Sequence, residues 1–477
     1  MTVTHRKGSV LTSLRPYGSA AHMNLAAAVR ARRLGTRGWQ GAVNTAYDPL
    51  DPATASDPFA AYRALHSGGR LHYNAKRATW IVSRLDDVRA ALRDTDKIHS
   101  SEGVTRVRMA ADLVVVTDGE QHSRLRKQVQ PAFTRRALDS WQAITGRLAT
   151  ELVGNVLANP GCDVVEELAI PMPLRVIAGL LGIPETDIAD FRRWSERAVQ
   201  LINFTPTPSG ALGVARSMSA ALALRRYFLK QLAGGHLTGS ETVLGRLMEH
   251  STDDALDDEQ LFLIAMLLLI AGNETTTNLL GGMFDTFARN PHEYEKIRAD
   301  PDLIPMAIEE LLRFTSPIQN LYRYTCADYQ IGDVTIPTGS RVLLSFGAAN
   351  RDPRAFGDPD AFIADRNPRM HVAFGYGAHM CLGAPLARME AEAVLRELVE
   401  RVERISATGP TTWSTNSSLR GPTTLPVRLH RGAARRGDAR DPPGRARPGH
   451  LLYDALVQGE VVLHDAHRRH ARLPLPQ

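Results

Sequence analysis

Residues 258–289 limit the possible folds of this 477-residue chain more than any other segment. The segment, DEQLFLIAMLLLIAGNETTTNLLGGMFDTFAR, is too long and too apolar for a helix on a protein surface. A membrane span needs about 20 apolar residues, and the longest apolar run here, residues 261–271, is shorter. The sequence therefore predicts a helix that crosses the core of one large domain, and it predicts no membrane span.

Most of the remaining regular segments predict further helices. They are expected over residues 57–65, 85–92, 119–160 with a break near Pro131, 167–230 with a loop at 203–210, 302–315 and 384–404. Strands are expected over residues 79–84, 329–346 and 424–430, and turn formers within the second stretch favour antiparallel pairing. Residues 350–370 are rich in Pro, Asp, Arg and Gly and predict a long coil. The predicted fold class is mainly α with small antiparallel β-sheets.

The positive charge of the chain belongs to its two ends. The formal net charge is +6, but residues 1–45 carry +7 and residues 431–477 carry +4, which leaves −5 for residues 46–430. A nucleic-acid-binding surface needs a basic patch on a folded face, so no nucleic-acid partner is expected. We expect residues 1–45 to be a basic disordered leader and residues 431–477 a disordered Arg/Pro-rich tail. A transit peptide, an upstream start codon and a non-native reading frame are the alternatives for these ends.

The three cysteines, Cys162, Cys326 and Cys381, lie far apart and form no CxxC pair. This spacing disfavours a disulfide framework and a structural zinc site. It fits a reducing compartment, so a cytoplasmic protein is expected.

One of these cysteines lies in a glycine-rich segment, FGYGAHMCLGAPLAR, residues 374–388. Gly375, Gly377 and Gly383 permit a tight turn that brings backbone close to a flat group. The proline that follows suits the first turn of a helix, and a thiolate just before a helix N-terminus is favoured by the helix dipole. The segment therefore indicates that Cys381 is a sulfur ligand, and the alternative is a buried structural cysteine.

The same segment resembles the cysteine signature of the cytochrome P450 family, Phe-x-x-Gly-x-(Arg/His)-x-Cys-x-Gly. Its fixed positions are occupied by Phe374, Gly377, His379, Cys381 and Gly383. The resemblance implies the P450 fold over residues 46–430. It also implies that Cys381 is the thiolate ligand of the iron of haem b (iron protoporphyrin IX), which favours O–O cleavage. By the same resemblance, His379 would face a haem propionate.

A second motif is Glu310-Leu-Leu-Arg313, which places a carboxylate and a guanidinium on one helix face. Taken alone, such a pair is a common solvated ion pair. It resembles the family's ExxR motif, and this implies that it joins Arg366 and braces the cysteine segment.

The core helix contains a third motif, Ala271-Gly-Asn-Glu-Thr-Thr276. Glycine in a helix interior costs about 1 kcal/mol relative to alanine, and a buried acid costs more unless it is paired. The motif resembles the family's acid–alcohol pair, which implies that Glu274 and Thr275 deliver protons and that the helix opens locally there. The alternative is a polar helix face turned toward a loop.

A fourth motif places His122 and Arg126 on one helix face at a spacing of i,i+4. Taken alone, it is typical of a surface charge run. Together with Arg323 it resembles the family positions that bind the haem propionates, for which arginine is well suited. Arg124 and Lys127 fall off this face and could meet an acidic redox partner.

The resemblance implies a monooxygenase that inserts one atom of O2 into a lipophilic small molecule and releases the other as water. The chain has no dinucleotide-binding fingerprint, so a ferredoxin and an NAD(P)H-dependent ferredoxin reductase are the expected electron donors. The substrate pocket is expected to involve residues 101–115, 196–215, 268–272, 318–321 and 416–419. Arg106 and Arg108 could receive an acidic substrate group or be solvated.

Three alternatives follow from the same residues. A peroxygenase of this family would use hydrogen peroxide directly, but that branch resembles a variant with Arg-Pro in place of Glu274 and Thr275. A non-catalytic haem sensor would tolerate loss of these two residues. A hydrolase based on Cys381 needs a base within hydrogen-bond reach, and it leaves Glu310 and Arg313 unexplained.

Overall fold

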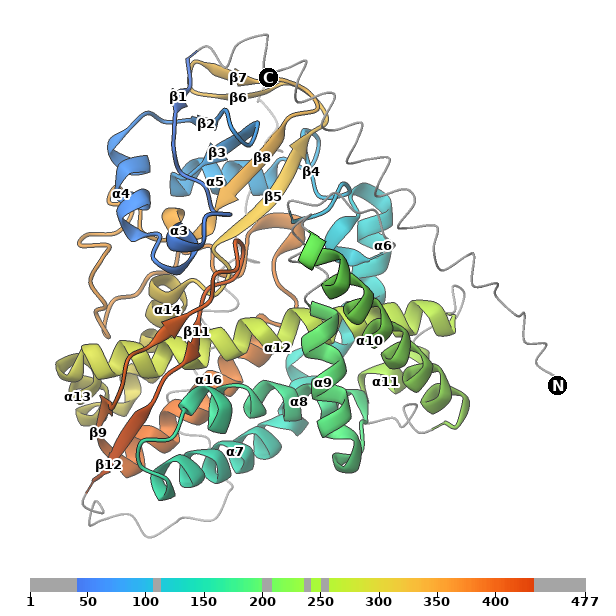
Figure 1. The fold of residues 1–477 in the computed structure, drawn as a ribbon, viewed down its shortest axis with the longest axis vertical. Coiled ribbons are helices and arrows are strands. Elements are labelled where there is room, and N and C mark those ends of the chain that lie inside the picture. The colour runs from blue at the N-terminus through green and yellow to red at the C-terminus, as the bar shows by residue number, and fades with distance from the viewer. Residues whose placement is uncertain (1–40, 106–112, 200–207, 236–241, 250–256, 433–477) are drawn as a thin grey trace, which may run out of the picture.

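The computed structural model describes residues 41–105, 113–199, 208–235, 242–249 and 257–432. Helices dominate these residues (Figure 1), as the sequence predicts. The helices are α3 (Pro52–Ser56), α4 (Phe59–Ser67), α5 (Leu85–Arg93), α6 (Gly119–Val129), α7 (Arg135–Ala158), α8 (Pro171–Leu181), α9 (Ile188–Val199), α10 (Pro208–Ala233), α11 (Val243–Glu249), α12 (Asp258–Arg289), α13 (Pro291–Ala299), α14 (Ile304–Thr315), α15 (Phe346–Ala349) and α16 (Ala384–Arg401).

Helix α12 spans the predicted core segment and crosses the middle of the molecule (Figure 1). It begins with a capping box in which Asp257 Oδ1 accepts from Gln260 N at 2.8 Å and Gln260 Oε1 accepts from Asp257 N at 3.0 Å. It packs on α8, α10, α14 and α16, and every residue from Thr276 to Phe287 is buried. Among the described residues, α12 is also the one helix whose length and composition would suit a membrane span. Half of its apolar window is buried within the fold.

The largest sheet has six strands in the order β1-β2-β3-β8-β5-β4. These strands are β1 (Val43–Asn44), β2 (His72–Asn74), β3 (Thr79–Val82), β4 (Ile98–His99), β5 (Asn320–Thr325) and β8 (Arg341–Ser345). Pairs β1–β2 and β3–β8 are parallel, and the other pairs are antiparallel. The prediction of small sheets is confirmed, but this sheet is mixed. Strands β3 and β8 are far apart in the chain, so their pairing is not restricted to a hairpin.

Three two-stranded sheets are antiparallel, as expected. They are formed by β6 (Tyr329–Ile331) with β7 (Val334–Ile336), β9 (Val402–Ala407) with β12 (Val427–Arg431), and β10 (Thr412–Trp413) with β11 (Pro422–Thr424). The predicted stretch 329–346 therefore divides between one hairpin and strand β8 of the larger sheet.

Some predicted boundaries differ from the observed ones. Helix α16 ends at Arg401 and the chain continues directly into β9, whereas the prediction extended the helix to residue 404. Helix α10 begins at Pro208, so the end of the predicted loop 203–210 is helical, with proline in the first turn. Residues 203–207 lie outside the described part of the chain, as do residues 1–40 and 433–477 of the predicted leader and tail.

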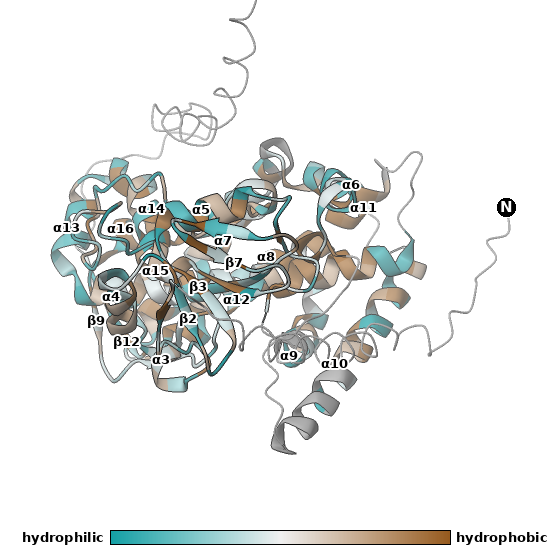
Figure 2. Cartoon of the chain, turned by 90° about the horizontal axis from the view of Figure 1, so that it is seen from above, coloured by the Kyte–Doolittle hydropathy of each residue, from teal (hydrophilic) through white to brown (hydrophobic). Residues whose placement is uncertain are grey.

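Two main groups of buried apolar side chains hold these elements together. The larger group joins α7, α8, α12, α14 and α16, and the smaller group joins the six-stranded sheet to α5. In Figure 2 the hydrophobic colour is concentrated on the central helices α8 and α12. The glycine-rich segment around Cys381 contacts α5 at one end and continues into α16 at the other.

Candidate functional site

The cysteine loop, residues 374–383, turns tightly in front of α16. Cys381 N donates to Phe374 O at 2.9 Å, and Met380 N donates to Gly377 O at 3.1 Å. Gly377 has a φ of 70°, and a Cβ at this position would lie 2.7 Å from Leu92 O at the end of α5. Because only glycine fits this conformation and this close approach, the loop is held against α5 in one shape.

Cys381 is exposed in the cysteine loop, although protein atoms lie close enough to its sulfur for burial to raise the pKa of its thiol. The backbone N–H groups of Gly383 and Ala384 and the charges of Arg388 and Arg126 act in the opposite direction and favour the thiolate. These groups alone do not bring the pKa of the Cys381 thiol below its usual value. A bound metal cation would stabilise the thiolate further.

Four basic or donor side chains form a group on the side of Arg126, which lies near the cysteine sulfur. They are His122 and Arg126 of α6, Arg323 of β5 and His379 of the cysteine loop. His122 is 4% exposed, and its Nε2 has no hydrogen-bond partner among the described residues. Its ring centroid lies 4.2 Å from that of His379. Burial, with the charges of His379 and Arg126, lowers the pKa of His122 to about 4.

Neither arginine of this group has a direct carboxylate contact among the described residues; Arg323 is buried and Arg126 is partly buried. Arg323 is 3% exposed, and burial lowers the pKa of its guanidinium to about 10. Its Nη1 donates to Tyr322 O at 2.9 Å. Burial also lowers the pKa of Arg126, and the nearby charge of a Cys381 thiolate opposes this shift. A buried cation is costly unless it is paired, so this group of residues is suited to an anionic ligand.

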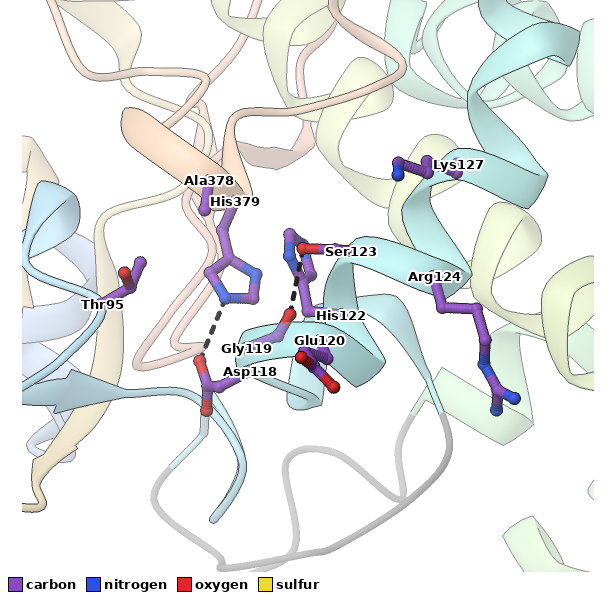
Figure 3. Close-up of a pocket in the computed structure, with 10 residues that line it drawn as sticks. All are labelled: Thr95, Asp118, Gly119, Glu120, His122, Ser123, Arg124, Lys127, Ala378 and His379. Carbon is purple, nitrogen blue, oxygen red and sulfur yellow. Dashed lines mark hydrogen bonds and ion pairs between the residues drawn. The ribbon is translucent and has the colours of Figure 1, made fainter.

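Asp118 completes this group and is a residue that the sequence reasoning missed. Its Oδ1 lies 3.2 Å from His379 Nε2, and its Oδ2 accepts from Ser100 N and Ser101 N, both at 2.8 Å. Burial alone would raise the pKa of Asp118, but these hydrogen bonds hold it at about 2. Asp118 thus fixes the His379 ring from one side, as Figure 3 shows.

An open pocket of about 550 Å³ lies beside His122 and His379 (Figure 3). Its lining includes Arg124 and Lys127 of α6, but also Glu120. Arg124 and Lys127 lie further along the helix than His122 in this view. The pocket wall therefore has mixed charge.

The residues around Cys381 fit an iron porphyrin. A thiolate is an established type of haem iron ligand, and the two carboxylates of a haem would pair with the buried guanidinium groups and the histidines. Two observations within the described part of the chain support this fit: the Nε2 of His122 has no hydrogen-bond partner there, and the buried Arg323 contacts no carboxylate there.

The structure brings together the predicted triad of Glu310, Arg313 and Arg366. Glu310 and Arg313 are fully buried and form two hydrogen bonds of 2.7 Å, and Arg366 Nε lies 3.3 Å from Glu310 Oε1. Arg313 also donates to the carbonyl oxygens of Asn350, Pro359 and Ala361. The pair is therefore not a solvated surface ion pair, and it fixes the coil over residues 350–370.

A second set of contacts carries this support to the cysteine loop. Asn350 Oδ1 accepts from Val372 N at 2.7 Å. Glu309 accepts from Arg388 Nε at 2.5 Å and from Arg388 Nη2 at 2.9 Å, and its Oε2 lies 2.9 Å from His371 Nε2. Burial alone would raise the pKa of Glu309, but Arg388 and His371 hold it well below its usual range.

Sequence reasoning missed this clamp of Glu309, His371 and Arg388 (hereafter the Glu309 clamp). The guanidinium of Arg388 also lies 4.6 Å from the centre of the Phe374 ring. The position of Glu309 directly before Glu310 was the available signal, but its partners are distant in the chain.

On α12, the hydroxyl of Thr275 donates to Ala271 O at 2.7 Å. Burial raises the pKa of Glu274, interaction with the Asn416 side chain lowers it, and Glu274 Oε2 has no hydrogen-bond partner among the described residues. The helix is continuous from Asp258 to Arg289, so the expected local opening is not seen. A Cβ on Gly272 would lie 2.7 Å from Ile177 Cδ1, which gives that glycine a packing role.

Only part of the predicted substrate pocket can be followed. Ile318 pairs with Leu419 in an antiparallel bridge, so the predicted wall segments 318–321 and 416–419 are adjacent. Arg106, Arg108 and much of the segments 101–115 and 196–215 lie outside the described residues.

Comparisons with known proteins identify the family of this chain. The family model described as Cytochrome P450 matches residues 236–419. The beta-dihydromenaquinone-9 omega-hydroxylase of Mycobacterium tuberculosis is 44% identical over 419 residues, covering 87% of this chain and 86% of the relative. The cytochrome P450 monooxygenase PikC of Streptomyces venezuelae is 33% identical, covering 79% and 92%.

A similar solved structure is that of cytochrome P450 CYP109Q5 from Chondromyces apiculatus, with a TM-score of 0.73 and 31% identity. The match covers 82% of this chain and 100% of that one. The chain therefore belongs to the cytochrome P450 family. It is a monooxygenase of bacterial type, and its family implies a haem cofactor.

Proposed function

We propose that Cys381 is the thiolate ligand of haem b, and that the protein hydroxylates a lipophilic substrate with electrons from a ferredoxin and its NAD(P)H-dependent reductase. The observation that carries this proposal is the exposed Cys381 of the tight loop, with Arg126 near its sulfur, together with the buried Arg323 and the adjacent rings of His122 and His379. When bound, the haem supplies the activation of O2.

The four residues of this group would bind the two haem propionates. Arg323 and Arg126 are the stronger partners, because a guanidinium can donate two parallel hydrogen bonds to one carboxylate. His379 keeps its Nε2 on Asp118, so its other ring nitrogen remains for a propionate. His122 Nε2, which has no partner in the described ranges, would serve the same purpose.

The cysteine loop would control the charge on the sulfur. The N–H groups of Gly383 and Ala384 and the side chain of Arg388 favour a negative sulfur. Glu309 holds Arg388 in place through two hydrogen bonds. The loop thus combines the sulfur ligand with hydrogen-bond donors that stabilise negative charge on that sulfur.

Glu274 and Thr275 would deliver protons on the opposite side. Burial favours the protonated form of Glu274, which suits a group that must release a proton and take one up again. Thr275 donates its own hydrogen to Ala271 O, and its oxygen remains able to accept a hydrogen bond. This pair argues against the peroxygenase alternative, which would not need it.

The substrate is proposed to be a long lipophilic molecule such as an isoprenoid quinone. Support comes from the similarity to a protein named beta-dihydromenaquinone-9 omega-hydroxylase. The adjacent segments 318–321 and 416–419 would form part of the pocket wall. Arg124 and Lys127 would contribute to ferredoxin binding, and the protein would act in the cytoplasm.

The test compares two reaction conditions for the purified holoenzyme with a menaquinone as substrate. Hydroxylated product is expected with ferredoxin, reductase and NADPH, and little is expected with hydrogen peroxide alone. Equal product with peroxide alone would favour the peroxygenase. NADPH consumption without organic product, across a broad set of lipophilic compounds, would favour a haem sensor and contradict the proposal.

A further inference from the structure

The first segment of the proposed substrate wall, residues 318–321, is joined to the second by two buried amino acids with amide side chains. Gln319 N donates to Ser418 O at 2.7 Å, and Asn320 Nδ2 donates to Ser417 O at 2.9 Å. Both Gln319 and Asn320 are buried. The position of the second wall segment, which contains Ser417 and Ser418, therefore depends on how these two residues are held.

The orientation of the Gln319 amide follows from its own hydrogen bonds. Its Nε2 donates to Thr315 O at 3.2 Å and to Ser316 O at 2.5 Å. Since the nitrogen is used there, the Oε1 atom faces the hydroxyl of Tyr62 in α4, which donates to it at 2.5 Å. A Cβ on Gly347 would lie 2.6 Å from the Tyr62 hydroxyl oxygen, so glycine at this position leaves room for the hydrogen bond.

Asn320 is held by a tyrosine in the same way. Its Nδ2 is used by Ser417 O, and its Oδ1 accepts from the Tyr47 hydroxyl at 3.1 Å. The ring centres of Tyr47 and Tyr62 lie 6.0 Å apart, and both side chains are buried in one cluster. Asn74 Nδ2 donates to Tyr47 O at 2.8 Å, which fixes the backbone of that tyrosine. Two neighbouring hydroxyls thus orient the two amides that join the wall segments.

The end of the second wall segment is anchored separately by Arg420. Its guanidinium carbon lies 4.6 Å from the centre of the Phe59 ring and 3.8 Å from a ring centre of Trp413. Its Nε donates to Ser56 O at 3.1 Å, and its backbone N donates to Pro317 O at 3.0 Å. Because Arg420 keeps the chain attached at this end, loss of a tyrosine hydroxyl should change the wall locally and leave the fold intact.

We propose that Tyr47 and Tyr62 are positioning residues for substrate selection, because their hydroxyls orient Gln319 and Asn320 and so fix the two wall segments relative to each other. This inference rests on the proposed function, which assigns those segments to the substrate pocket. Neither tyrosine belongs to a segment that is expected to line the pocket. The preference of the enzyme for a substrate would then depend on residues behind the wall.

Tyr47→Phe and Tyr62→Phe each remove one hydroxyl and keep the aromatic ring. The amide oxygen that loses its donor stays buried, so the loss of this hydrogen bond is costly. Tyr329→Phe is the matched control, because Tyr329 is also a buried tyrosine but belongs to the separate sheet of β6 and β7.

The first readout is hydrogen exchange of backbone amides in the holoprotein. Exchange over residues 316–321 and 414–421 is expected to become about tenfold faster in Tyr47→Phe and Tyr62→Phe, as the loss of one buried hydrogen bond implies. Exchange over β9 should not change, which would show that the effect is local. The Tyr329→Phe control should match the unsubstituted protein in all three segments.

The second readout compares the binding of imidazole and of 1-dodecylimidazole, followed by the shift of the haem Soret band. Both probes offer a nitrogen ligand to the iron, and only the second carries an apolar chain that would lie along the pocket wall. The ratio of the two dissociation constants measures the preference for the chain. This preference is expected to fall about tenfold in Tyr47→Phe and Tyr62→Phe and to stay unchanged in Tyr329→Phe.

Unchanged exchange in both variants would show that the hydroxyls do not hold the wall, and it would overturn the inference. Faster exchange with an unchanged preference for the chain would leave the two tyrosines a purely structural role, which also contradicts it. So would a fall in preference that is equally large in Tyr329→Phe. If neither probe shifts the Soret band of the unsubstituted protein, the proposed haem function fails instead, and the exchange measurement alone decides the positioning role.

Discussion

The two sides of the proposed haem site differ in how their buried carboxylates are paired. On the cysteine side, Glu310 and Glu309 each bind an arginine through paired hydrogen bonds, and the cysteine loop is held by further backbone contacts. On the α12 side, Glu274 Oε2 and Asn273 Oδ1 are buried without a hydrogen-bond partner among the described residues. Satisfied buried networks give rigidity, whereas an unsatisfied buried group is costly and is a candidate for function.

This contrast teaches that the same residue type can serve two purposes in one site. Arginine contacts hold the pKa of Glu309 low, and burial raises the pKa of Glu274. The first is a permanent charge that orients Arg388, and the second is a group suited to exchange a proton. Substitutions on the cysteine side should therefore change the free energy of unfolding. Substitutions on the α12 side should change the product formed per NADPH.

The largest effect is expected for Glu310→Ala. The substitution leaves Arg313 buried without its carboxylate, and breaking such a pair costs about 3–5 kcal/mol. Urea unfolding of the holoprotein should show this loss, with a smaller loss for Glu310→Gln. A free energy of unfolding within about 1 kcal/mol of the unsubstituted protein would contradict the structural role of the triad.

The next effect is expected for Glu274→Gln. Loss of a positioned acid typically costs 10²–10⁴-fold in a proton-transfer step, so product formation should fall at least about 100-fold, while stability changes little. Steady-state product and NADPH measurements would show this, and Thr275→Ala is the companion variant. If Glu274→Gln were instead to destabilise the fold as strongly as Glu310→Ala, the distinction between the two sides would be lost.

A smaller effect is expected for Asp118→Asn. The pKa of Asp118 is lowered from 3.8 to about 2 in the folded protein. Its stabilising contribution, about 2 kcal/mol, is therefore present above pH 4 and is lost as the pH falls through about 2. Urea unfolding across this range should show the two proteins converging at low pH. A difference in unfolding free energy between the two proteins that grows on acidification would contradict a lowered pKa for Asp118.

The smallest effect is expected for the surface of α6. Exposed charges contribute mainly to association rates and are screened by salt. Replacing Arg124 and Lys127 together by alanine should slow ferredoxin-dependent reduction a few-fold at low salt, and the difference should shrink at high salt. Replacing Glu120, which lines the same pocket, by alanine is the matched control and should not slow reduction.

Local sequence patterns predicted the elements that depend on neighbouring residues. Helix α12 was predicted with the observed bounds because its apolar run is long, and the glycines around Cys381 indicated the tight turn. The Glu310–Arg313 pair was also visible, because its spacing lies within one helix. Its joining with Arg366 came from the family resemblance.

The contacts that were missed join residues far apart in the chain. Asp118 meets His379, and Glu309 meets Arg388 and His371. No local period records such pairs, because they arise only when separate elements pack together. The parallel pairing of β3 with β8 was missed for the same reason.

The most direct test of the account is the absorption spectrum of the reduced, CO-bound protein before and after Cys381→Ala. The unsubstituted protein, supplied with haem, is predicted to show the far-red-shifted Soret band of a thiolate-ligated haem, and the variant is predicted to lose it. A protein that stays colourless after haem supplementation would contradict the account. So would a variant that keeps the same spectrum without the sulfur of Cys381.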